Sequence, residues 1–121
     1  FEPQAIVTEY VEKINKLGIS LFNKKDSYKA NKELRRVVNL LSQKYIECLY
    51  DDWDLLKEQK ILSYNNLCCI YKKLGKSEIA LKMVKFAQEL EEQLYKKRYG
   101  CANLSIVSTF LNKYSILLEM K

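Results

Sequence analysis

Apolar residues recur every three or four positions along almost the whole chain, a spacing that places them on one face of an α-helix. Polar or glycine-containing breaks interrupt this spacing near residues 23–26, 50–52, 75–77 and 99–101. No stretch shows the strict alternation of apolar and polar residues that is typical of a strand. The pattern therefore predicts an all-α protein with five helices. We expect these helices at about residues 3–22, 27–50, 52–74, 77–98 and 102–120.

Residues that favour helix ends stand at these breaks. Asp26 or Ser27 is a suitable N-cap for the second helix, and Asp52 is suitable for the third. Gly75 is suited to ending the third helix in a left-handed conformation, and Ser77 to capping the fourth. Connections of about two to five residues make successive helices antiparallel neighbours.

One helix pair carries a specific set of large and small residues. Its first helix has an aromatic residue, a leucine, a small residue and a second aromatic residue; a Leu-Gly turn follows, and the second helix has two small residues around a bulky one. The set is Tyr64, Leu67, Cys68, Tyr71, Leu74, Gly75, Ala80, Val84 and Ala87. This arrangement resembles the tetratricopeptide repeat (TPR), a helical-repeat family. The short residues let two antiparallel helices approach closely.

The same frame fits two further parts of the chain. The first helix pair matches it at Ile14, Leu17, Gly18, Leu21, Ala30, Leu34 and Val37, and the last helix matches it at Phe110, Asn112 and Leu117. Matching positions are about 50 and about 46 residues apart, whereas an ordinary TPR has about 34 residues. We expect the surplus segment Tyr45–Lys60 to lengthen helices rather than to form a loop.

The resemblance implies a single domain of antiparallel helical hairpins stacked as a short TPR-like α-solenoid. Repeat one would cover about residues 4–50, repeat two about 52–98, and a partial third repeat 102–121. The chain begins without methionine, and we expect it to be a fragment of a longer protein.

The residues that are missing exclude several classes of chemistry. The chain has 121 residues and no histidine, which excludes catalytic triads that use imidazole and His-ligated metal sites. Its cysteines, Cys48, Cys68, Cys69 and Cys101, do not have the spacing of a zinc site, and we expect reduced thiols in a cytoplasmic protein. No apolar run reaches the length of a membrane span. We therefore expect no enzyme activity, no metal and no cofactor.

The charge balance is moderately basic. Lys and Arg total 21 against 15 Asp and Glu, which gives a formal net charge of +6. The lysines are spread along the chain, and the arginines are Arg35, Arg36 and Arg98. This disfavours a nucleic-acid partner, because base recognition commonly uses arginine, whereas an acidic protein partner remains compatible with the charge.

The first helices of such repeats line a concave face that binds peptides or helices of other proteins. We therefore predict a non-catalytic protein–protein interaction or scaffold module. The predicted partner-binding residues are Asn15, Lys16, Ile19, Asn65, Asn66, Cys69, Lys72, Lys73 and Asn112. Asparagine amides would grip an extended peptide backbone, and the lysines would attract an acidic peptide. Asn66 fits the carboxylate-binding set of the family, but Ile19 stands where that set has an asparagine.

Two other functions stay open at this point. The last helix is apolar on more than one face, so a second copy could cover Leu111 and Leu118 and make a homodimer. Such self-association would suit an assembly domain of a cytoskeletal or ciliary scaffold. A three-helix trafficking adaptor of the microtubule-interacting-and-transport type would instead bind amphipathic helices.

Overall fold

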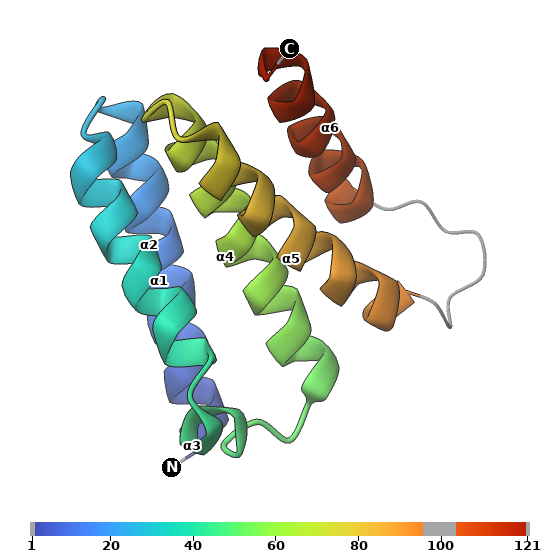
Figure 1. Cartoon of the computed structure of the whole chain (residues 1–121). Coiled ribbons are helices and arrows are strands. Elements are labelled where there is room, and N and C mark those ends of the chain that lie inside the picture. The colour runs from blue at the N-terminus through green and yellow to red at the C-terminus, as the bar shows by residue number, and fades with distance from the viewer. Residues whose placement is uncertain (1, 96–103, 121) are drawn as a thin grey trace.

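The computed structural model describes residues 2–95 and 104–120, and every regular element in these ranges is an α-helix (Figure 1). The all-α prediction is confirmed. The helices are α1 (Pro3–Asn23), α2 (Ser27–Leu41), α3 (Lys44–Glu47), α4 (Trp53–Lys73), α5 (Ser77–Tyr95) and α6 (Leu104–Glu119). These are six helices rather than the expected five, because the short α3 follows α2.

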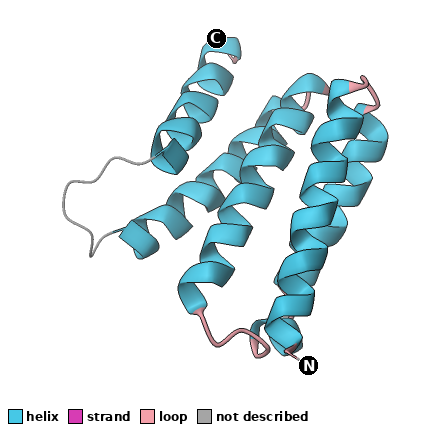
Figure 2. Ribbon diagram, turned by 180° about the vertical axis from the view of Figure 1, so that it is seen from behind, coloured by secondary structure: helices cyan, strands magenta, loops and turns pink. Residues whose placement is uncertain are grey.

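The helix α4 lies at the centre of the arrangement and contacts α1, α2, α5 and α6. In addition, α1 packs on α2 and α5 packs on α6. Figure 1 shows α2 and α5 in front of α1 and α4, and Figure 2 shows the same helices from behind. The helices α1, α4 and α6 form a row in which each helix contacts the next. Within the described ranges, no helix has the length and apolar character needed to cross a membrane.

The turns after α1 and α4 have the same geometry, although only one of them contains glycine. Lys25 and Gly75 stand 50 positions apart and both adopt a left-handed backbone conformation, with φ angles of 66° and 76°. In both turns the N–H of the following residue donates to the carbonyl oxygen five positions back, at 2.9 Å. These bonds form the Schellman motif that satisfies the last carbonyls of a helix. Within each pair, α1 with α2 and α4 with α5, the two helices are therefore joined by the same type of turn.

Most of the predicted helix ends are confirmed. Asp26 and Asp52 are the N-caps of α2 and α4, and their Oδ1 atoms accept the N–H three positions ahead at 3.2 and 3.1 Å. The prediction for Ser77 is wrong, because α5 begins at Ser77 itself, which places this residue in the first turn. The expected boundary near Tyr99 lies outside the described residues.

We expected the segment Tyr45–Lys60 to lengthen helices rather than to form a loop, and this expectation is only partly correct. The helix α2 ends at Leu41, and α3 has only four residues before a connection leads to Trp53. From Trp53 onward the segment does belong to α4, as expected. The segment is therefore part short helix, part connection and part extension of α4.

Contacts with distant residues hold this connection in place. The Oε1 atom of Gln4 on α1 accepts the N–H groups of Asp51 and Asp52 at 2.7 and 3.0 Å. Tyr50 is buried, and its hydroxyl donates to Oε1 of Gln59 on α4. Because Gln4 accepts two backbone N–H groups that a continued helix would otherwise pair, the chain can leave the helical path here.

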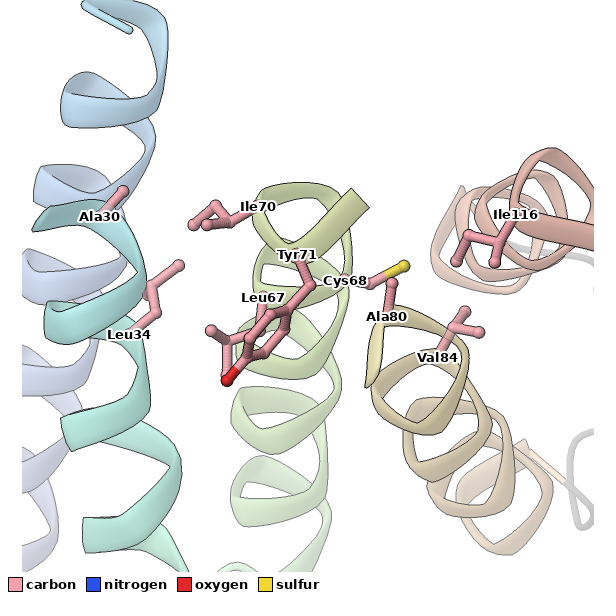
Figure 3. Close-up of a cluster of buried hydrophobic side chains, with 9 residues drawn as sticks. All are labelled: Ala30, Leu34, Leu67, Cys68, Ile70, Tyr71, Ala80, Val84 and Ile116. Atoms are coloured by element: carbon pink, nitrogen blue, oxygen red, sulfur yellow. The ribbon is translucent and has the colours of Figure 1, made fainter. Parts of the chain in front are cut away.

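The largest core cluster joins α2, α4, α5 and α6. Its buried residues are Ala30, Leu34, Leu67, Cys68, Ile70, Tyr71, Ala80, Val84 and Ile116 (Figure 3). The small residues predicted at close helix contacts are all buried: Gly18, Cys68, Ala80 and Ala87. A Cβ atom added at Gly18 would lie 2.8 Å from Cγ of Leu34, closer than side chains tolerate. The approach of α1 to α2 therefore depends on glycine at this position.

Substitution of each of the two residues with a left-handed backbone conformation tests whether the two turns have the same geometry. We expect Gly75→Ala to lower the free energy of unfolding by about 1 kcal/mol through backbone strain alone, since no atom lies within 4 Å of the added Cβ. We expect Lys25→Gly to raise it by about 0.5 kcal/mol, because strain is removed while glycine adds unfolded-state entropy. Urea denaturation of both variants measures these changes. Equal and unchanged midpoints would contradict the shared turn geometry.

Candidate functional site

The row of α1, α4 and α6 brings together most of the predicted partner-binding residues. The asparagines of this face hydrogen-bond to one another across the helices rather than pointing freely to solvent. We call the resulting set of six side chains the asparagine ladder. Its first rung consists of Asn15, Ser63 and Asn66, and its second rung consists of Asn65, Thr109 and Asn112.

The first rung links α1 to α4. The Nδ2 atom of Asn15 donates to Oγ of Ser63 and to the carbonyl oxygen of Val11, both at 3.0 Å. The Oδ1 atom of Asn15 accepts from Nδ2 of Asn66 at 2.8 Å. Asn15 is only 3% exposed. Its amide is therefore already hydrogen-bonded inside the protein, at a position that lines the groove between α1 and α4, and a contact with a ligand stays a prediction.

The second rung repeats this geometry between α4 and α6. Asn65 stands 50 positions after Asn15, and its Nδ2 atom donates to Oγ1 of Thr109 at 2.9 Å and to the carbonyl oxygen of Ile61 at 3.2 Å. Its Oδ1 atom accepts from Nδ2 of Asn112 at 3.1 Å. Each rung thus joins an asparagine to a hydroxyl and to an asparagine three residues later on the next helix.

The residues at equivalent positions on the outer helices end the ladder. On α1, the positions equivalent to Ser63 and Asn66 hold Lys13 and Lys16, which are exposed. On α6, the position equivalent to Asn65 holds Leu111, which is 57% exposed. The ladder is therefore complete with α1, α4 and α6.

Two adjoining grooves lie on the same face. The first has a volume of about 350 Å³ and lies between α1 and α4, and the second has about 580 Å³ and lies between α4 and α6. Leu62 and Asn66 line both grooves, and Leu62 is 47% exposed. Lys16 and Ile19, two of the predicted partner-binding residues, line the first groove. The grooves also contain two carboxylates that the sequence did not single out, Glu12 and Glu58.

The predicted lysines of α4 lie outside both grooves. The Nζ atom of Lys72 donates to the Ser115 hydroxyl and lies 3.6 Å from Oε1 of Glu119. Lys73 is exposed at the end of α4. The charge of Lys72 is therefore partly balanced by α6, which weakens the argument for an acidic peptide at this place.

The thiols on α4 are poor nucleophiles at neutral pH. Burial raises the pKa of Cys68 to about 12, and it also raises the pKa of Cys69, although the charge of Lys72 partly opposes both shifts. Sγ of Cys69 lies 3.7 Å from Oδ1 of Asn112. Because the thiolate is the reactive form, these pKa shifts oppose nucleophilic chemistry. In residues 2–95 and 104–120, no three His, Cys, Asp or Glu side chains are grouped as a metal site requires.

Sequence reasoning missed Leu62, Ser63 and Thr109 as members of this face. Ser63 and Thr109 are fully buried hydroxyl residues about 46 positions apart, the same interval that relates Asn66 to Asn112. A polar residue that recurs at the repeat interval on an otherwise apolar stripe was the available signal. Leu62 had no such signal, because its exposure depends on the gap between neighbouring helices.

Removing one amide tests the ladder. We expect Asn15→Ala to lower the free energy of unfolding by about 1–3 kcal/mol, because the fully buried Ser63 hydroxyl then loses its donor and Asn66 loses its acceptor. The exposed Asn39 on α2 provides the control, and Asn39→Ala is expected to stay within about 0.5 kcal/mol of the parent. Chemical denaturation of both variants decides the point. Equal losses would mean that the first rung does not stabilise the contact between α1 and α4.

No known protein family, curated protein or solved structure matches this chain. Within the chain, the helix pair α1–α2 is similar to the helix pair α4–α5. This similarity rests on the two left-handed turns and on the two rungs of the asparagine ladder.

Proposed function

We propose that this chain is a non-catalytic protein-interaction module of the TPR-like α-solenoid type, and that it binds an amphipathic helix of a partner protein. The observation that carries the proposal is the pair of adjoining grooves along α1, α4 and α6, which share Leu62 and Asn66. The repeated turns and rungs support the TPR-like architecture. The six helices of residues 2–95 and 104–120 do not fit the three-helix trafficking adaptor. We expect the setting to be cytoplasmic, as in a scaffold.

The chemistry of the grooves favours an amphipathic helix over an acidic peptide. Leu62 and Ile19 expose apolar surface, 47% and 36%, that a partner's apolar side chains would cover. The carboxylates of Glu12 and Glu58 offset the positive charge of Lys16 within the grooves. Apolar contacts between a helix and a groove are a common way for helical proteins to recognise partners.

Peptide selection followed by a groove variant tests this function. We expect amphipathic helical peptides selected from a displayed library to shift the amide NMR signals of α1 and α4. Leu62→Glu should weaken their binding at least about tenfold, because it places a charge where apolar surface is covered. Leu49→Glu changes a leucine of 36% exposure that lines neither groove, and it should leave the affinity unchanged. Equal effects of the two substitutions would reject the grooves as the binding site.

The salt dependence of the same binding distinguishes the two kinds of partner. Binding through apolar contacts should change little when the salt concentration rises. A steep loss with salt, together with a loss in the double variant Lys72→Glu and Lys73→Glu, would instead identify an acidic peptide as the partner.

Self-association through α6 is a second candidate function, favoured by one observation. The side of α6 opposite its buried residues is apolar and carries no charged side chain. Its exposed residues are Val107, Phe110, Leu111, Tyr114, Leu117 and Leu118. The rings of Phe110 and Tyr114 are stacked, with centroids 6.2 Å apart. A second copy would remove this surface from water, which is the driving force for many symmetric dimers.

Sedimentation over a wide concentration range tests the second candidate. We expect a reversible dimer that Leu111→Glu with Leu118→Glu converts to a monomer, because each added charge would be buried in the contact. The double variant Ile6→Glu with Leu17→Glu changes exposed apolar residues of α1 and should leave the dimer intact. A parent protein that stays monomeric at every concentration would reject this candidate.

A further inference from the structure

A third groove, separate from the face of α1 and α4, lies between the C-terminal part of α5 and the N-terminal part of α6. Its volume is about 700 Å³. It opens on the other side of α6 from the groove that Asn112 lines. Ile106 and Phe110 of α6 contribute apolar wall, and Phe110 is 60% exposed. A groove of this size can accept several side chains of a partner.

The charge of this groove is opposite to the charge of the whole chain. Glu89, Glu91 and Glu92 line it, and none of the lining residues in the described ranges is a lysine or an arginine. Lys113, the nearby cation of α6, donates to Oε1 of Gln88 at 2.9 Å. The walls that residues 88–95 and 106–110 give the groove are thus negative, in a protein with a formal net charge of +6.

Glu91 is the buried member of the three. It is 5% exposed, and Oγ of Ser105 donates to its Oε2 atom at 2.6 Å. In residues 2–95 and 104–120 no lysine or arginine forms an ion pair with it. Burial raises the pKa of Glu91, although hydrogen bonds from Ser105 and Thr109 act in the opposite direction. Within the described part of the chain, the carboxyl group therefore has no cation that would compensate its removal from water.

Comparison of the two helix pairs shows that this carboxyl group is not required by the fold. Counting 50 positions back from Glu91 leads to Leu41 on α2, which is 0% exposed. Two earlier pairs of positions that are also 50 residues apart, Ala30 with Ala80 and Leu34 with Val84, are apolar and buried in both helix pairs. The α5 helix thus has an acid where its counterpart has a core leucine. Since an unpaired buried carboxylate lowers stability, its presence points to a ligand that supplies the missing charge.

We propose that the groove between α5 and α6 binds a single arginine side chain carried by an apolar segment of a partner protein. Glu91 accepts the guanidinium group through its Oε1 atom, Glu89 and Glu92 attract it to the groove, and Ile106 and Phe110 cover the apolar side chains beside it. Arginine suits the site better than lysine, because its planar, paired donors match a carboxylate and its charge is less strongly hydrated. This inference does not depend on the grooves along α1 and α4.

A pair of matched peptides provides the probe. The first is a synthetic helical peptide of about 14 residues, built from leucine, alanine and glutamine with one central arginine. The second has citrulline, a neutral isostere, in place of the arginine. We expect the arginine peptide to shift the amide NMR signals of the C-terminal half of α5 and of α6. The citrulline peptide should bind at least about tenfold more weakly, because it lacks the charge that Glu91 accepts.

Three variants complete the experiment. Glu91→Gln keeps the shape and should weaken binding of the arginine peptide at least about tenfold, whereas Glu78→Gln, at the exposed start of α5 and outside all three grooves, should leave it unchanged. Glu91→Leu copies the residue of the first helix pair and should raise the melting temperature while abolishing binding, which shows that binding is not lost through unfolding. The proposal is overturned if the two peptides bind equally, if Glu91→Gln has no effect, or if the parent protein does not bind the arginine peptide.

Discussion

Hydrogen bonds between side-chain amides set the register in which α1, α4 and α6 pack. Asn15 and Asn65 each use both ends of their amide, donating to a hydroxyl and accepting from a second asparagine on the next helix. An amide that is unpaired away from water costs about 1–3 kcal/mol, so sliding or rotating one helix against the next is unfavourable. The grooves on the same face have their shape because this register leaves Leu62 between the rungs.

The two helix pairs share a left-handed turn and several buried small or apolar positions, and they differ at most other positions. The left-handed turn is built once with Lys25 and once with Gly75. The core position that holds Leu41 in the first pair holds Glu91 in the second. Both exchanges alter strain or charge at equivalent positions while the turn keeps its left-handed geometry. One helix pair can thus carry a distinct side chain while the other keeps a plain structural residue at the equivalent position.

Features that depend on neighbours in the sequence were predictable, and features that depend on distance between helices were not. The caps Asp26 and Asp52 follow from residues three positions away, and helical spacing alone predicts the all-α fold. The bond between Asn15 and Asn66 joins residues 51 positions apart and depends on how far one helix is displaced along the next. Apolar spacing identifies a face but not this displacement, so the sequence does not reveal that these amides bond to one another. The short α3 was missed for the same reason, since the distant Gln4 holds the connection that follows it.

The different burial of the cysteines gives the protein an internal reporter of local opening. Cys48 is exposed, whereas Cys68 is 1% exposed between α4 and α5 and has its pKa raised to about 12 by burial. A thiol reagent therefore modifies Cys48 in the folded protein but reaches Cys68 only when these helices separate. The ratio of the two modification rates follows the population of molecules in which the central contact is open. The native cysteines thus allow the opening of the contact between α4 and α5 to be measured without an introduced label.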